Sequence, residues 1–147
     1  MKIAIGSDHA GYEEKETIKK QLEQMGIECE DFGTDSARNS VDYPDFAALV
    51  GNAVTSGKAD RGILVCGTGI GVSIAANKIP GVRAALAWSA ETAKLARSHN
   101  DANVLTVGAR TSTPENIKEI INAYITSQFE GGRHALRVEK IAQLEKK

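Results

Sequence analysis

Short apolar runs alternate with longer amphipathic segments along the whole chain. The clearest run, Ile63 to Val65, is continuous rather than alternating, as expected of a strand that is buried on both faces of a parallel sheet. Similar runs predict further strands on either side of it. Together the predicted strands span residues 2–5, 27–32, 63–65, 82–88 and 104–107.

The segments between these runs have the three- and four-residue spacing of apolar side chains that is typical of helices. The clearest helix follows Thr113 and carries one apolar stripe, made of Ile117, Ile120, Ile121, Tyr124 and Ile125. Other helices are predicted at about residues 12–24, 45–56, 72–78 and 89–98. After the break at Gly131 and Gly132, a last, highly charged helix begins near Arg133 and has only a narrow apolar edge.

Strands that alternate with helices predict a parallel sheet covered by helices on both faces. We therefore expect residues 1–147 to form a single doubly wound α/β domain of the Rossmann or flavodoxin-like type, with an extra C-terminal helix. The expected sheet has about five parallel strands in the order 2-1-3-4-5. That order places the loops after strands one and three together at the topological switch point.

The composition excludes several classes of function. Lys and Arg number 18 and Asp and Glu 19, so no excess of positive charge favours nucleic acid or an anionic membrane as partner. The chain has neither the apolar run of a signal peptide near its start nor a stretch as long as a membrane span. Two cysteines cannot form a disulfide framework. We expect a cytoplasmic protein.

The segment from Cys66 to Gly71 is the strongest candidate for chemistry. Glycines at 67, 69 and 71 separate the buried strand from the following helix, an arrangement that offers backbone N–H groups to an anion. The spacing differs from the dinucleotide motif G-x-G-x-x-G, and the Gly-Lys-Ser/Thr ending of nucleotide hydrolases is absent. A cysteine phosphatase needs arginine where Val72 stands. Taken alone, the segment fits an oxyanion loop with a reactive thiol and a tight turn with a structural thiol equally well.

Other polar residues stand at the ends of predicted elements. Asp8 and His9 follow the first strand, and Arg110 follows the fifth. Arg133 and Arg137 are one helical turn apart and share a face. Metal binding is not expected, because no two His or Cys residues have the spacing of metal ligands.

These parts together suit proton transfer on a phosphorylated sugar. A base removes a proton next to a carbonyl, and the N–H groups of the glycine loop stabilise the enediolate that results. A thiolate at a helix N-terminus can act as that base, and arginines can hold the phosphate.

The motifs also resemble those of the type B ribose-5-phosphate isomerases, a family that includes allose-6-phosphate isomerases and galactose-6-phosphate isomerase subunits. The resemblance covers essentially the whole chain. It rests on Gly-Ser-Asp-His-Ala-Gly at 6–11, Asp-Tyr-Pro at 42–44, Cys-Gly-Thr-Gly-Ile-Gly at 66–71, Ser-Ile-Ala-Ala-Asn-Lys at 73–78, Ala-Arg-Ser-His-Asn-Asp-Ala-Asn-Val-Leu at 96–105, Gly-Ala-Arg at 108–110 and Phe-Glu-Gly-Gly-Arg-His at 129–134.

The resemblance implies a role for each motif. Cys66 is then the base that moves the proton between C2 and C1, Thr68 assists on the substrate oxygens, and His99 opens the furanose ring. One branch of the family uses a glutamate deeper in the loop and helix, near Ile70, so this chain follows the cysteine branch. The implied substrate-binding residues are Asp8, His9, Tyr43, Gly67, Gly69, Ile70, Gly71, Asn100, Arg110, Arg133, His134 and Arg137. The resemblance further implies a homodimer or a dimer of dimers with a site shared between subunits, and no cofactor.

Three alternatives stay open from the sequence. In the first, the chain is an isomerase of a 6-phosphohexose, such as allose or galactose 6-phosphate. In the second, the chain is a phosphate-ligand-binding module without catalysis. A hydrolase that pairs Cys66 with His99 is the third. The loop from Gly33 to Val41 is a candidate wall for discriminating between sugars.

Overall fold

The chain folds into alternating strands and helices, and the structure, a computed structural model, describes residues 1–146. Its strands are β1 (Lys2–Ser7), β2 (Glu28–Asp31), β3 (Arg61–Cys66), β4 (Ala84–Leu86) and β5 (Val104–Gly108). Its helices are η1 (His9–Gly11), α1 (Tyr12–Gln24), α2 (Tyr43–Thr55), α3 (Ile70–Ala76), α4 (Ala90–Asn100), α5 (Pro114–Thr126) and α6 (Arg133–Gln143). Within residues 1–146, every helix is too short or too polar to cross a lipid bilayer.

The strands form one parallel sheet in the order β2-β1-β3-β5-β4. The predicted fold class is confirmed, but the predicted order 2-1-3-4-5 is wrong, because β5 lies between β3 and β4. Burial agrees with the observed order. Every residue of β5 is buried, as expected of an inner strand, whereas the three residues of β4 are only partly buried, as expected of an edge strand. The predicted strand at 82–88 is correspondingly reduced to Ala84–Leu86.

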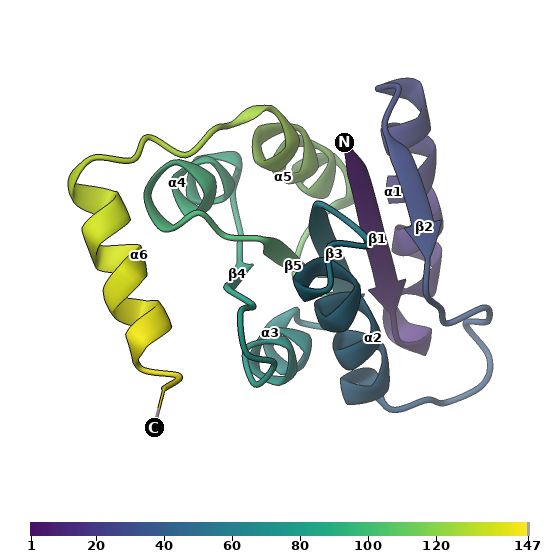
Figure 1. Cartoon of the computed structure of the whole chain (residues 1–147). Helices are drawn as coiled ribbons and strands as arrows, with labels where there is room; N and C mark the ends of the chain where they lie inside the picture. Colours follow the sequence, from purple (N-terminus) through teal and green to yellow (C-terminus); the bar gives the residue numbers. More distant parts are fainter. Residues whose placement is uncertain (147) are drawn as a thin grey trace.

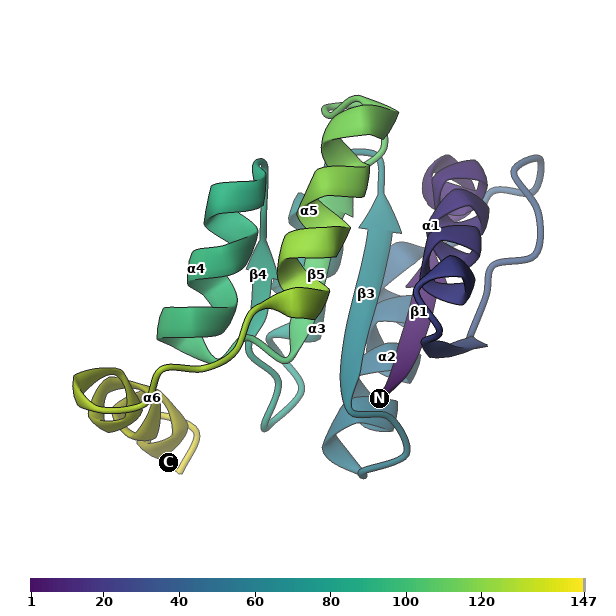
Figure 2. The same cartoon turned by 90° about the horizontal axis from the view of Figure 1, so that it is seen from above.

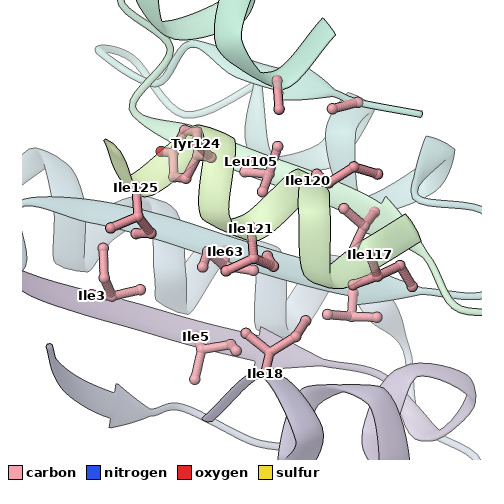
Figure 3. Close-up of a cluster of buried hydrophobic side chains, with 14 of the residues drawn as sticks. Ile3, Ile5, Ile18, Ile63, Leu105, Ile117, Ile120, Ile121, Tyr124 and Ile125 are labelled. Atoms are coloured by element: carbon pink, nitrogen blue, oxygen red, sulfur yellow. The ribbon is translucent and has the colours of Figure 1, made fainter. Parts of the chain in front are cut away.

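Helices cover both faces of the sheet (Figure 1), and the side chains of successive strand residues enter two separate core layers. In β3, Ile63 and Val65 face the layer under α1, α4 and α5, whereas Leu64 and Cys66 face α2 and α3. Figure 3 shows the α5 stripe lying over the first layer, with Ile121 above Ile63. The predicted stripe is therefore confirmed as the inner face of α5. Cys66 belongs to the opposite layer.

The predicted starts of α1, α4, α5 and α6 agree with the structure to within one residue, whereas α2 and α3 begin two residues earlier than predicted, at Tyr43 and Ile70. Local residues explain several of these starts. Ser89 forms a capping box with Thr92 at the start of α4. Thr113 accepts a hydrogen bond from the N–H of Asn116 at the start of α5. Pro44 lies in the first turn of α2, where its missing N–H costs nothing.

Helix α6 stands apart from the layers that cover the sheet (Figure 2). Each of its residues is exposed or only partly buried. Its apolar edge leaves large side chains in contact with solvent, and Leu136 is 63% exposed. Such an edge stabilises the chain little by itself.

A buried ion pair fixes the start of the loop that follows β2. The ammonium group of Lys15, which is 1% exposed, donates to both carboxylate oxygens of Asp31 at 2.7 and 2.6 Å and to the carbonyl of Thr34 at 2.7 Å. Burial by itself raises the pKa of the Asp31 carboxyl, but hydrogen bonds from Lys15 and Lys19 outweigh it and hold the pKa below its usual value. The ionised carboxylate therefore stabilises the fold.

We expect Asp31→Asn to lower the free energy of unfolding by about 1–2 kcal/mol at pH 7, because Lys15 then stays buried without its counter-charge. The effect is no larger because Asp31 is partly exposed and solvent screens its charge. Because the folded-state pKa of Asp31 is lowered, its stabilisation is present above the unfolded-state pKa and disappears as the pH falls through the folded-state value. Urea unfolding at several pH values measures this. The gap between wild type and variant should close in acid, and a gap that stays constant contradicts the assignment. Glu30→Gln, which breaks an exposed pair with Lys2, is the matched control with a much smaller effect.

Candidate active site

Three neighbouring strands end at one edge of the sheet and carry most of the predicted site. Asp8 and His9 follow β1, the glycine loop from Cys66 to Gly71 follows β3, and Arg110 follows β5. Strands β1 and β3 are neighbours in the sheet, so the predicted switch point is confirmed. Ligands of open α/β sheets bind at this position, outside the carboxyl ends of the strands.

The thiol of Cys66 is held inside the glycine loop. Its Sγ accepts a hydrogen bond from the N–H of Gly69 at 3.2 Å, and the residue is 4% exposed. Gly69 has φ of +78°, and a Cβ there would lie 2.6 Å from Leu86, so only glycine fits the turn. The hydroxyl of Thr106 donates to the carbonyl of Gly69 at 2.9 Å. The loop therefore points an N–H group, and with it positive charge, at the sulfur atom.

The rest of the loop offers further polar groups. The Oγ1 of Thr68 accepts from the N–H of Ile70 at 3.1 Å, which leaves the exposed hydroxyl of Thr68 free to donate its own proton. The N–H of Gly71, in the first turn of α3, has no acceptor within that helix. The loop can therefore stabilise an oxyanion next to the thiol.

Two glycines of the loop make room for large side chains. A Cβ at Gly67 would lie 3.3 Å from the guanidinium of Arg110, and one at Gly71 would lie 2.6 Å from the ring of Tyr43. Arg110 also donates its backbone N–H to the carbonyl of Gly67 at 2.8 Å. The structure thus places Arg110 and Tyr43, two of the predicted substrate-binding residues, in contact with the glycine loop.

Asp8 and His9 complete this edge. A carboxylate oxygen of Asp8, which is 6% exposed, accepts the N–H of Gly11 at 3.0 Å. The Nδ1 of His9 accepts the N–H of Val41 at 3.2 Å, so a neutral His9 carries its proton on Nε2 and can donate it to an anion.

The remaining predicted site residues lie at the other edge of the sheet. His99 and Asn100 end α4, just before the chain enters β5 at its amino end. The five residues of β5 separate the two edges by roughly 16 Å. Arg133, His134 and Arg137 belong to α6, which lies at the end of the sheet opposite to the arrowhead of β3 (Figure 2). Within one chain, these five residues do not meet the Cys66 loop.

At that second edge, the structure brings together two histidines that are remote in sequence. The rings of His99 and His134 stack with their centroids 4.1 Å apart and an angle of 10° between their planes. Burial lowers the pKa of His134, and the nearby charges of His99 and Arg133 lower it further. The N–H of Glu130 donates to the carbonyl of Ser98 at 3.0 Å, so the segment before α6 is tied to the end of α4.

Thr106 and Val41, which lie outside the predicted set of site residues, also support the Cys66 edge. Thr106 fixes the glycine loop, and a single hydroxyl in an otherwise apolar buried strand was a usable signal. Val41 orients His9 through its backbone, and no side-chain pattern reveals that contact. Cys29 lies away from the site, and burial followed by the charge of Asp31 raises the pKa of its thiol to about 11, so it stays protonated.

The Cys66 edge combines a thiol in a glycine loop, Cys66, with an acid and a histidine, Asp8 and His9, at the switch point of the sheet. Such a site is suited to proton transfer on an anionic substrate.

The chain belongs to the Ribose/Galactose Isomerase family, whose model matches residues 3–141. It is 47% identical over 146 residues to ribose-5-phosphate isomerase B of Escherichia coli, covering 99% of this chain and 97% of that protein. It is 45% identical over 145 residues to D-erythrulose-4-phosphate isomerase of Pectobacterium atrosepticum, covering 99% and 95%. The solved structure of Clostridium thermocellum ribose-5-phosphate isomerase B superposes with a TM-score of 0.97 at 51% identity, covering 99% and 98%.

Proposed function

We propose that the protein is an aldose–ketose isomerase that interconverts ribose 5-phosphate and ribulose 5-phosphate through an enediolate. One observation carries the proposal: the Cys66 thiol accepts a hydrogen bond from the Gly69 N–H inside the glycine loop. A cysteine with a purely structural role would not need such a loop around it. The relatives from E. coli and C. thermocellum, which are named for this activity, support it. The reaction needs no cofactor, because the proton and the electron pair stay within the substrate.

In the proposed reaction, the thiolate of Cys66 removes the proton from C2 of the open-chain aldose. The electron pair moves towards the carbonyl oxygen, and the N–H groups of the glycine loop stabilise the enediolate. Thr68, whose hydroxyl proton is free, passes a proton between the two substrate oxygens. The thiol then returns its proton to C1, which completes the ketose and restores the thiolate. The base is therefore unchanged after each turnover.

Arg133 and Arg137, two of the residues that would bind the phosphate, come from a second copy of the chain in this proposal, whereas His9 and Arg110 belong to the Cys66 edge. Cys66 and Arg133 lie at opposite edges of one chain, so one chain cannot bring both to a five-carbon substrate. A homodimer resolves this if α6 of the partner subunit covers the Cys66 edge. The exposed apolar edge of α6, including Leu136, supports such a contact because dimerisation would remove it from water.

Incubation of the pure protein with ribose 5-phosphate, followed by detection of ribulose 5-phosphate, tests the proposed function. A non-catalytic binding module and a cysteine hydrolase both predict no ketose. Allose 6-phosphate and galactose 6-phosphate belong in the same assay, because the matched family takes its name from ribose and galactose. A kcat/KM for either hexose phosphate above that for ribose 5-phosphate would reassign the substrate.

His99→Asn is expected to impair turnover of a cyclic sugar phosphate far more than that of an acyclic one. A tetrose 4-phosphate cannot form a furanose ring because its C4 oxygen is phosphorylated, and the P. atrosepticum relative is named for a four-carbon substrate. The expected loss on ribose 5-phosphate is about 10²–10⁴-fold in kcat, with a much smaller loss on D-erythrose 4-phosphate. Equal losses on both would remove His99 from ring opening.

A further inference from the structure

A cluster of three side chains at the amino edge of the sheet has the composition of a metal site. The Nε2 atoms of His99 and His134 face the same oxygen of Glu130, at 3.9 and 3.6 Å. One ligand atom from each of the three residues lies within 4.8 Å of the other two. We call this set, His99, Glu130 and His134, the His99 cluster. It lies outside the edge that carries Cys66.

Backbone hydrogen bonds bring together the two chain segments that carry the His99 cluster. The bond from the Glu130 N–H to the carbonyl of Ser98 places the glutamate beside the last turn of α4, where His99 lies. The N–H of His134 donates to the carbonyl of Gly131 at 3.1 Å and fixes the first turn of α6. Two segments that are about thirty residues apart are thus joined at the cluster, so a ligand orders little additional chain.

The ligand atoms of the His99 cluster are also available. Within residues 1–146, the three side chains make no hydrogen bond, and both distances to the Glu130 oxygen exceed hydrogen-bonding range. Two imidazole nitrogens and one carboxylate oxygen form a set that binds Zn²⁺, with bonds of about 2.0–2.2 Å and ligand atoms roughly 3.3–3.5 Å apart. The ligand atoms must therefore approach one another. Because the two imidazole rings are stacked almost parallel, one ring must also turn so that both Nε2 lone pairs point at the same ion. Glu130, whose side chain is 59% exposed, and His99, 39% exposed, are free to do so.

We propose that His99, Glu130 and His134 form a binding site for Zn²⁺. Imidazole nitrogen selects a borderline transition-metal ion over Mg²⁺ or Ca²⁺, which prefer oxygen ligands. The positive charges of Arg133 and Arg137 lie close enough to His134 to lower its pKa, and they also repel a bound Zn²⁺. The site is therefore expected to bind zinc more weakly than a dedicated structural zinc site. With three protein ligands, the fourth position stays open to water or to a substrate oxygen.

Occupation of the site has a consequence for turnover, which rests on the proposed function. Zn²⁺ occupies Nε2 of His99, so His99 can no longer exchange a proton through this atom in the ring opening that is proposed for it. The bound ion therefore inhibits turnover of ribose 5-phosphate reversibly and leaves turnover of an acyclic substrate less affected. The metal acts here as an inhibitor and not as a cofactor.

Zinc titration of the chelator-treated, full-length protein against a chromophoric zinc indicator tests the binding. One Zn²⁺ per chain is expected, and Glu130→Gln and His134→Ala should each weaken binding by about tenfold or more. Cys66 and Cys29 are alternative zinc ligands, so a variant with both changed to alanine is the control and should bind as the wild type does. X-ray absorption at the zinc edge should show nitrogen and oxygen neighbours only. Unchanged binding in Glu130→Gln and His134→Ala, loss of binding in the cysteine variant, or sulfur next to the metal each overturns the proposal.

The inhibition is measured separately, on ribose 5-phosphate and D-erythrose 4-phosphate with and without Zn²⁺. The zinc concentration for half-inhibition should rise about tenfold in Glu130→Gln, and a chelator should restore activity in the wild type. Half-inhibition at the same zinc concentration in both proteins overturns the inhibitory role. If the protein turns over neither sugar phosphate, the proposed function fails while the binding titration still decides the zinc site.

Discussion

Cys66→Ala is expected to lower kcat for ribose 5-phosphate by about 10²–10⁴-fold while the fold stays intact. The thiol ends β3 and accepts a hydrogen bond from the Gly69 N–H, so its removal takes away the proposed base and leaves the glycine loop in place. Steady-state kinetics measures kcat, and circular dichroism with a thermal melt reports on the fold. The side chain is small, so the cavity left behind should cost little stability.

Cys29→Ala is the matched control for this variant. Cys29 is partly buried and away from the site, and burial raises the pKa of its thiol, so its loss should leave kcat unchanged. Iodoacetamide should inactivate the wild type and Cys29→Ala, and the substrate should protect both. Near-normal turnover by Cys66→Ala, or labelling of Cys66 that substrate does not slow, would exclude the thiol as the base.

Two inactive variants are expected to regain activity when their subunits exchange. Cys66→Ala lacks the proposed base, and the double variant Arg133→Ala, Arg137→Ala lacks the proposed phosphate contacts. Each of these contacts is worth roughly 1.5–3 kcal/mol as a charge-assisted hydrogen bond. In a mixed dimer, the chain with intact Cys66 meets the intact arginines of its partner, and one of the two sites is complete. Random exchange makes half of the dimers mixed, so about a quarter of the wild-type activity should return.

The experiment needs proof that exchange took place. Two different affinity tags on the variants allow mixed dimers to be purified in succession, and each variant exchanged with itself gives the background. If purified mixed dimers stay at that background, the site is not shared in the proposed way. Sedimentation of the wild type gives an independent check, because a purely monomeric protein would also exclude a shared site.

Much of the fold could be predicted from local patterns, because periodicity and capping act within one segment. The stripe from Ile117 to Ile125 predicted the inner face of α5, and Thr113 predicted its start. The strand order could not be predicted in this way. It depends on which of two neighbouring strands gains more from burial, and the difference between the fully buried β5 and the half-buried β4 exists only once the helices cover the sheet.

The candidate site divides along the same line. The run from Cys66 to Gly71 by itself determined a strand, a turn and a helix start, because glycine alone accepts the backbone of that turn and carries no side chain that would collide with Leu86. Residue types therefore indicated an oxyanion loop. Tertiary structure alone decided which groups reach it, since contacts such as that of Val41 with His9 come from chain segments without a periodic relation.

Tertiary structure also decided that one chain holds the site residues in two groups. Parallel strands bring the loops after β1, β3 and β5 to one edge, and α4 returns the chain to the opposite edge before β5 begins. His99 therefore meets Glu130 and His134 instead of Cys66. The residue types along the sequence determined which chemical groups the chain offers. The direction in which each element runs decided which of those groups meet, because the packed sheet, and not the order along the chain, sets distances in space.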